Sequence, residues 1–332
     1  MSEQTDVKKR RPFLQETNPL LLKELRGRMR GARAFVVLSL YLLVLSCIAS
    51  VVYYVYTASS GGMGGGPDLA YLGKTFFGTV VIIEILMTLF ITPAFTAGAI
   101  SGERERKTYE VLRTTLLSAR QVVFGKLGSA LMYIFLLILV AVPMQSLAFL
   151  FGGVTVGEFA VALVLLTVSA MTFAVIGLFF SSLVQKTLVA TVLTYAAILV
   201  LSLALPAVLL LLAGLGGSYL YTLDNMEPSS SAIPPWIWEA ALMYGAILLA
   251  SLSPLSTAIL TETFLEQYDT LFFHWEEVGH MFVSYGPSMP APPATQSIPI
   301  LSPWILMVAI YLALAALLLF LTVRRVRRRA AE

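Results

Sequence analysis

The sequence predicts an all-α integral membrane protein with six transmembrane helices. Hydrophobic residues make up 58% of the 332 residues and charged residues only 12%, about half the charged fraction of an ordinary soluble domain. Apolar runs of at least about 18 residues recur along the chain, and this is the length that a helix needs to cross a bilayer. Lys and Arg cluster beside these runs in the pattern of cytoplasmic loops.

The distribution of positive charge sets the expected topology. Of the 22 Lys and Arg residues, nine lie in 1–33, six in 101–126 and five in 324–329. Between Leu215 and Trp304 there is none, against eight Asp and Glu. We therefore expect a multi-pass protein of the plasma membrane whose two termini are cytoplasmic. Basic clusters next to spans typically bind lipid headgroups, so the lipid bilayer is the expected partner and nucleic acid is not.

Three regions follow from this pattern. Residues 1–33 are expected to form a cytoplasmic tail with an amphipathic helix, residues 34–323 the transmembrane domain, and residues 324–332 a basic cytoplasmic tail. The six spans are predicted at about 34–57, 75–99, 122–151, 159–180, 187–213 and 303–323. Gly152 and Gly153 predict a tight turn, and Pro206 predicts a kink in the fifth span.

The segment 214–302, between spans five and six, is predicted to lie outside the cell. Within it, 236–252 is apolar enough to enter lipid but contains Glu239. If this stretch crossed fully, the Arg-rich C-terminus would lie outside, against the charge rule. We interpret 236–252 as a re-entrant or interfacial helix and 254–304 as an outer loop, with a full crossing as the open alternative.

An amphipathic helix is expected before the first span. Asn18 and Pro19 form a typical helix start, and leucines at helical spacing alternate with the charged residues Lys23, Glu24 and Arg26. Such a helix lies on anionic headgroups. It is interpreted either as a topology anchor alone or as an additional contact for a partner.

The charged stretch 101–120 separates the second and third spans. Glu103 and Glu105 fall in an expected first helical turn, where the helix dipole favours negative charge, and Tyr109 and Leu112 begin an apolar stripe at helical spacing. We interpret the stretch as a cytoplasmic helix that docks on a partner; a solvated loop is the alternative. Ser118 and Gln121 form a capping box that predicts the start of the next helix.

Glu84 lies near the middle of the second span. A carboxylate at that depth costs about 2.5–3.5 kcal/mol on insertion scales, so it is expected to face protein or water rather than lipid. Two interpretations stay open. Glu84 either contacts a transport pathway, or it is a protonated side chain hydrogen-bonded to a neighbouring helix.

The sequence contains little that indicates a catalytic or metal-binding site. Gly73-Lys74-Thr75 lacks the earlier glycine of a phosphate loop, and the single Cys47 allows no cysteine-based metal site. His274 and His280 flank two glutamates, but their spacing matches no protease helix, so a solvated acidic surface is expected. We therefore expect no metal, no cofactor in this chain and no enzymatic activity of its own.

Several of these residues resemble a known family, the type-2 export class of ABC-transporter permeases. The resemblance rests on Asn18-Pro19 with Lys23 to Arg26 before the first span, on Ser253 to Ser256, and above all on the run Ala97 to Thr108, AGAISGERERKT. It covers about residues 15–328.

The resemblance implies a permease subunit of an ATP-driven exporter, in which two copies of a separate ATPase subunit use ATP and Mg²⁺. A second permease chain, identical or related, would complete the pathway. In this family the helix after span two and the entry helix contact the ATPase. The positions that this implies here are Glu103, Arg104, Glu105, Thr108, Tyr109 and Leu112, together with Lys23, Glu24 and Arg26 of the entry helix.

Two other classes remain as alternatives. A secondary transporter would show inverted repeats and several ion ligands near the middle of the membrane. In the predicted spans of this chain, Glu84 is the only clear charge at that depth. An intramembrane enzyme would need paired reactive side chains inside the spans, whereas both histidines lie outside the predicted spans. The transported substrate, the direction of transport and the choice between homodimer and heterodimer do not follow from the sequence.

Overall fold

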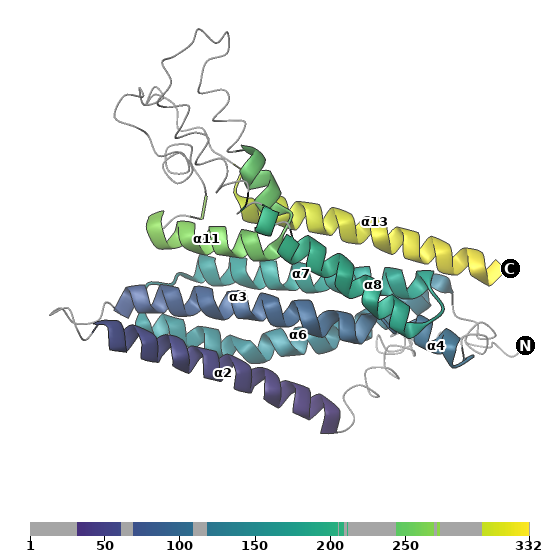
Figure 1. Ribbon diagram of the computed structural model, residues 1–332, viewed down its shortest axis with the longest axis horizontal. Coiled ribbons are helices and arrows are strands. Elements are labelled where there is room, and N and C mark those ends of the chain that lie inside the picture. The colour runs from purple at the N-terminus through teal and green to yellow at the C-terminus, as the bar shows by residue number, and fades with distance from the viewer. Residues whose placement is uncertain are drawn as a thin grey trace, which may run out of the picture.

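The computed structural model describes residues 32–60, 69–108, 118–204, 206–208, 211, 244–268, 271–272 and 301–331. In these parts of the chain the regular elements are helices (Figure 1). Six helices are long and apolar enough to cross a membrane. The prediction of an all-helical, multi-span membrane protein is therefore confirmed, whereas the predicted entry helix lies outside the described residues.

The long helices lie side by side along the longest axis of the molecule (Figure 1). They are α2 (Ala32–Ser60), α3 (Leu69–Thr96), α6 (Ala119–Phe151), α7 (Val156–Leu183), α8 (Thr187–Leu199) and α13 (Pro303–Ala331). Each predicted span overlaps one of these helices, but α8 ends at Leu199, where the predicted fifth span continues to 213, and α13 extends to Ala331, beyond the predicted end at 323. The largest shift at a helix start is in α3, which begins at Leu69 rather than at residue 75, so that Lys74 belongs to the helix.

The two ends of the bundle differ in their connections. At one end α6 passes into α7 through Gly152 and Gly153, whose φ angles of +87° and +83° are positive. This confirms the predicted tight turn, since glycine adopts positive φ without steric cost. At the other end α3 runs into the short helix α4 (Ser101–Glu105), and α7 turns into α8. We call these the Gly152 end and the α4 end.

Helix α7 lies at the centre of the bundle. It contacts α3, α6, α8, α11 and α13, and the consecutive residues Phe173, Ala174 and Val175 are all fully buried. A helix that is buried on every side needs apolar residues all round, which matches its sequence. Helix α2 is peripheral: it packs mainly on α3 and α6, and its side chains Phe35 and Tyr54 are exposed.

The fifth span changes its helix type near the expected kink. Helix α8 ends at Leu199 and continues as the π-helix η2 (Val200–Ala204), just before Pro206. A π-helical turn widens the backbone spiral and shifts the hydrogen-bonding pattern, which is a recognised cause of irregularity in long helices. The irregularity was predicted at Pro206, and the structure places a π-helical turn immediately before it.

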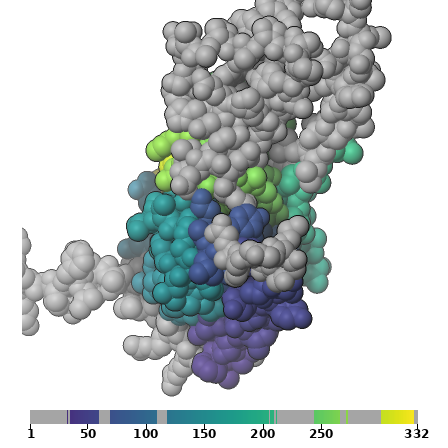
Figure 2. Space-filling view, turned by 90° about the vertical axis from the view of Figure 1, so that its left-hand side faces the viewer, coloured from purple at the N-terminus to yellow at the C-terminus, as the bar shows by residue number. Residues whose placement is uncertain are grey.

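The expectation of an outer loop over 254–304 is wrong in its first part. Residues Pro254–Tyr268 form the helix α11, which packs against α3, α7 and α13. Ser253 caps this helix by accepting a hydrogen bond from the Ser256 amide at 3.3 Å, and Pro254 occupies the first helical position. Figure 2, which looks onto the Gly152 end, shows α11 and α2 on opposite sides of α3.

Part of the predicted re-entrant segment 236–252 is described. Residues 244–251 are helical and join α11 through a turn at Leu252 and Ser253. The Leu252 carbonyl accepts a hydrogen bond from the Tyr311 hydroxyl at 3.1 Å, and the Ser253 hydroxyl donates to the Ser202 carbonyl of η2 at 2.9 Å. The turn therefore lies against α13 and η2, inside the bundle.

The charged stretch 101–120 forms a shorter helix than expected where the structure describes it. Helix α4 ends at Glu105 because Lys107 adopts a left-handed φ of 58°. The Thr108 amide then donates back to the Glu103 carbonyl at 2.9 Å, which is the hydrogen bond of a Schellman helix end. The capping box of α6 is confirmed, with Ser118 and Gln121 bonded reciprocally.

Candidate functional site

The predicted coupling residues that the structure describes, Glu103, Arg104, Glu105 and Thr108, lie at the α4 end, where four helices meet. The backbone amides of Ile100 and Ser101 donate to the hydroxyl of Ser181 at 2.9 and 3.0 Å. Ser181, which is fully buried near the end of α7, therefore satisfies two amides at the start of α4. We call residues 100–105, with the side chains and carbonyls of α6, α7 and α8 that they contact, the α4 clamp.

Glu103 binds the α6 helix. Its carboxylate lies 2.7 Å from the ammonium of Lys126, whose side chain is only 3% exposed, whereas Glu103 is 26% exposed. A charge as buried as Lys126 needs a counter-charge because water no longer solvates it. Sequence reasoning missed this role of Lys126, although a lysine two turns into an apolar helix is an unusual residue that could have signalled a buried partner.

Arg104 binds the end of α7. Its guanidinium donates to the carbonyls of Ser182 at 2.9 Å and Val184 at 3.3 Å. The last carbonyls of a helix have no partner inside the helix and carry partial negative charge, so a cation is favourable there. Arg104 thereby closes the C-terminal end of α7 from a different helix.

Glu105 binds the start of α8. Its carboxylate accepts hydrogen bonds from both the backbone amide and the hydroxyl of Thr187. The residue at the N-cap position of α8, Lys186, makes no side-chain cap. Glu105 supplies the missing acceptor and places negative charge at the positive end of the helix dipole. Three consecutive charged residues thus fasten three different elements to α4.

The remaining predicted contact residues extend beyond the clamp. Thr108 is exposed, and its hydroxyl donates to the Glu103 carbonyl. Tyr109, Leu112 and the entry-helix residues Lys23, Glu24 and Arg26 lie outside the described residues. From the last residue of α4 onward the described chain is exposed, over residues 105–108.

Glu84 lies deep in the bundle rather than at a surface. It is 1% exposed, and its carboxylate accepts a hydrogen bond at 2.7 Å from the side-chain amide of Gln145 on α6, which is fully buried. One further oxygen on each of the two side chains is buried without a hydrogen-bond partner. The hydrogen bond to a neighbouring helix is the feature that the second interpretation of Glu84 required.

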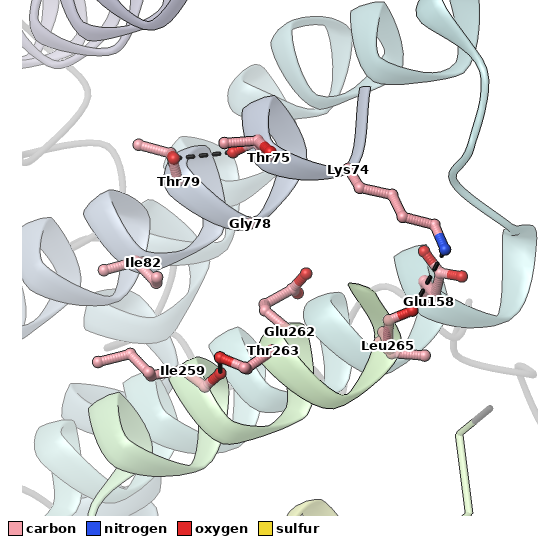
Figure 3. Close-up of a pocket in the computed structure, with 10 residues that line it drawn as sticks. All are labelled: Lys74, Thr75, Gly78, Thr79, Ile82, Glu158, Ile259, Glu262, Thr263 and Leu265. Carbon is pink, nitrogen blue, oxygen red and sulfur yellow. Dashed lines mark hydrogen bonds between the residues drawn. The ribbon is translucent and has the colours of Figure 1, made fainter. Parts of the chain in front are cut away.

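A cavity of about 150 Å³ lies at the Gly152 end, between α3, the first turn of α7, and α11 (Figure 3). Lys74 donates to the Leu265 carbonyl of α11 at 3.2 Å. Glu158 sits in the first turn of α7, where Thr155 caps its amide at 3.3 Å. Glu262 of α11 also lines the cavity.

Sequence reasoning did not assemble this cavity. Lys74 was considered for a phosphate loop, and Glu262 fell in a predicted loop. The start signal at Ser253 and Pro254 would have revealed α11 and with it the position of Glu262. In the parts of the chain that the structure describes, no group of three or more metal-ligating side chains occurs, and His274 and His280 lie outside those parts.

Comparison with protein-family models gives no match for this chain, and comparison with curated proteins gives none either. The fold therefore defines the class: a multi-span membrane protein with six helices able to cross a bilayer among its described residues. The likeness to exporter permeases remains a prediction from the sequence.

Proposed function

We propose that this chain is the membrane-spanning permease subunit of an ATP-driven ABC transporter, an exporter, and that it hydrolyses no ATP itself. Two such chains would form the translocation pathway between them, and two copies of a separate ATPase subunit would drive it with ATP and Mg²⁺. In this arrangement α4 and both termini face the cytoplasm of the cell, and the Gly152 end faces outward.

The observation that supports this proposal is the α4 clamp. Helix α4 follows α3 directly, and its charged residues bind α6 through Lys126, the end of α7 through two carbonyls, and the start of α8 through Thr187. A force on the exposed residues 105–108 would therefore reach four spans at once. Packed helices respond to such a force by moving as rigid bodies between discrete arrangements.

The turn at Leu252 and Ser253 fits the same proposal. Residues 244–251 and α11 would enter the membrane from the outer side and return to it, since the turn between them lies beside Tyr311 and Ser202. Irregular backbone at membrane depth is tolerated where protein covers it, and both hydrogen bonds supply that cover.

The test is reconstitution with the ATPase subunit that the proposal requires, sought first among the products of the genes that neighbour that of this chain. We expect the two proteins to co-purify, and we expect the chain to raise ATP hydrolysis by the ATPase in proteoliposomes. Arg104→Ala and Glu105→Ala should lower this stimulation at least fivefold, because each releases one element from α4. Ser59→Ala serves as the matched control, since this exposed hydroxyl donates to the Tyr56 carbonyl of its own helix.

Two results would oppose the proposal. One is full stimulation by both clamp variants at normal expression. The other is labelling of an introduced cysteine at residue 106 from outside the cell, which would place α4 on the wrong side of the membrane.

Ion-coupled secondary transport is the second candidate, and the buried pair of Glu84 and Gln145 favours it. A carboxylate in the middle of a bundle can carry a proton or an ion between two arrangements of the helices. This function predicts uptake or efflux driven by a proton or sodium gradient in proteoliposomes that contain the chain alone, without ATP. Loss of that transport in Glu84→Gln would support it.

A further inference from the structure

Helix α13 is longer than a bilayer core is thick. Its 29 residues span about 43 Å at 1.5 Å per residue, whereas the hydrocarbon core is about 30 Å thick and needs about 20 helical residues. Trp304 lies in the first turn of α13, and tryptophan favours the headgroup level. Counted from there, Arg324 and Arg328 lie at the headgroup level of the opposite leaflet. Figure 1 shows this part of α13 and the helix α4 at the same end of the bundle.

One exposed face of α13 changes from apolar to basic within a single turn. Leu317, Phe320 and Leu321 are exposed, and so are Arg324 and Arg328. Positions 317, 321, 324 and 328 follow one another at spacings of four and three, which place them on the same side of a helix. The face therefore offers an apolar surface at membrane depth and two guanidinium groups directly beyond it.

The opposite side of the same turns is packed into the bundle. Val326 is only 4% exposed and belongs to an apolar cluster with Ile100, Val123 and Leu127. Ile100 directly precedes α4, and the other two residues lie on α6. The arginines thus stand on a helix that is held in place rather than on a loose tail. Groups that are already positioned lose less conformational freedom when they bind, which favours binding at a defined place.

Positive charge dominates the exposed surface at the α4 end. Among the described residues there, the four arginines 324, 325, 327 and 328 of α13 and four further Lys and Arg are exposed, against one exposed carboxylate, that of Glu105. Within the described parts of the chain, the four arginines form neither a hydrogen bond nor an ion pair. Basic clusters directly beside a membrane span attract anionic lipids. The charge at this end therefore favours an anionic partner.

We propose that an anionic phospholipid of the leaflet at the α4 end binds this face of α13 and thereby stabilises the packing of α13 beside the α4 clamp. Its phosphate lies at Arg324 and Arg328, and an acyl chain runs along Leu317 and Leu321. An acidic protein or a nucleic acid would match the arginines but not the apolar part of the face. General attraction to a membrane would act on every exposed charge at this end, whereas this site needs the two arginines that continue the apolar face. The site requires no ATPase partner, so it stands or falls separately from the proposed function.

Thermal unfolding of the full-length protein in a neutral detergent tests the site. The delipidated protein is titrated with phosphatidylglycerol or with phosphatidylcholine, which carries the same acyl chains but no net charge. We expect phosphatidylglycerol at saturation to raise the unfolding midpoint by at least about 3 °C, because it binds the folded protein, and phosphatidylcholine to leave it unchanged. Arg324→Gln/Arg328→Gln should lose most of this shift. The matched control Arg106→Gln/Lys186→Gln removes the same charge from other elements at the α4 end and should keep it.

Native mass spectrometry counts the bound lipid directly and needs no variant, so it decides the case in which Arg324→Gln/Arg328→Gln does not fold. From micelles that contain equal amounts of the two lipids, we expect the unmodified chain to retain phosphatidylglycerol at least fivefold over phosphatidylcholine. Salt at about 0.5 M should lower this preference, because it screens exposed charges. Arg324→Lys/Arg328→Lys keeps both charges and should keep the preference.

Four results would overturn the proposal. Equal midpoint shifts with the two lipids, or equal retention of both, would show that the headgroup charge does not matter. An equal shift with glycerol phosphate, which lacks acyl chains, would show that a free anion suffices. A shift that survives Arg324→Gln/Arg328→Gln would place the lipid elsewhere, and equal losses in this variant and in its matched control would show that the attraction is diffuse.

Discussion

The two ends of the bundle use the same kinds of charged residue in opposite ways. At the α4 end, Glu103, Arg104 and Glu105 are bound to a lysine, to helix carbonyls and to a helix start in neighbouring elements. At the Gly152 end, Glu158 and Glu262 border a hollow that opens on the side of the bundle. Charges of the first kind fix the positions of helices relative to one another, whereas charges of the second kind line a cavity between helices.

This comparison predicts that substitutions at the α4 end cost stability and that those at the cavity cost little. Between the two ends lies the buried pair Glu84 and Gln145. The two side chains are hydrogen-bonded to each other, but one oxygen of each has no hydrogen-bond partner. Substitutions in this pair are expected to cost less stability than those at the α4 end and more than those at the cavity.

The largest effect is expected at Glu103. Glu103→Ala leaves Lys126, 3% exposed, without its carboxylate partner, and removing one member of a buried ion pair destabilises by about 3 kcal/mol. Reversible unfolding in mixed micelles measures the loss. The double variant Glu103→Ala/Lys126→Met should regain most of it, because no buried charge remains. A double variant as unstable as the single one would show that the ion pair is not the cause.

The next effect is expected at Ser181. Ser181→Ala leaves the amides of Ile100 and Ser101 without their acceptor, and buried donors without partners cost about 1–3 kcal/mol. Ser169→Ala in the same helix is the control, since this fully buried hydroxyl donates to the Leu165 carbonyl of its own helix. Equal losses in the two variants, measured by thermal unfolding, would contradict the role of Ser181 in joining α7 to α4.

A smaller effect is expected in the middle of the bundle. Gln145→Leu removes the hydrogen-bond donor to Glu84, and we expect a loss of about 1–2 kcal/mol because one buried acceptor loses its partner. Replacing both residues by leucine should be close to neutral, since an apolar pair of similar shape needs no partner. If the double variant is the less stable one in the same unfolding assay, the two side chains do not act as a pair.

The sequence predicted the six spans because long apolar runs admit few other structures. It also predicted the Gly152–Gly153 turn and the Ser118 capping box, since both depend on residues adjacent in the chain. The start of α3 was placed six residues late because Lys74 and the nearby glycines resemble a loop, whereas tertiary contacts extend the helix around them.

The partners of the charged residues could not be predicted from the sequence. Lys126 is 23 residues from Glu103, and Thr187 is 82 residues from Glu105, so only the packing of α6, α7 and α8 brings them together. Helix α11 was missed for a different reason: its modest hydropathy and its place in a segment without Lys or Arg suggested an outer loop. The cap at Ser253 indicated a helix start, but the absence of Lys and Arg in the segment was given more weight and led to the prediction of a loop.

The smallest effect on stability is expected at Glu262. Its side chain lines the cavity and is partly exposed, so Glu262→Gln, which keeps the shape and removes the charge, should change the free energy of unfolding by less than about 0.5 kcal/mol. Gly78→Ala is the sharper comparison, because its added methyl group would lie 3.2 Å from the Glu262 carboxylate and would narrow the cavity. If Glu262→Gln destabilises the protein as strongly as Glu103→Ala, Glu262 is a structural tie between α3 and α11, and the difference between the two ends of the bundle disappears.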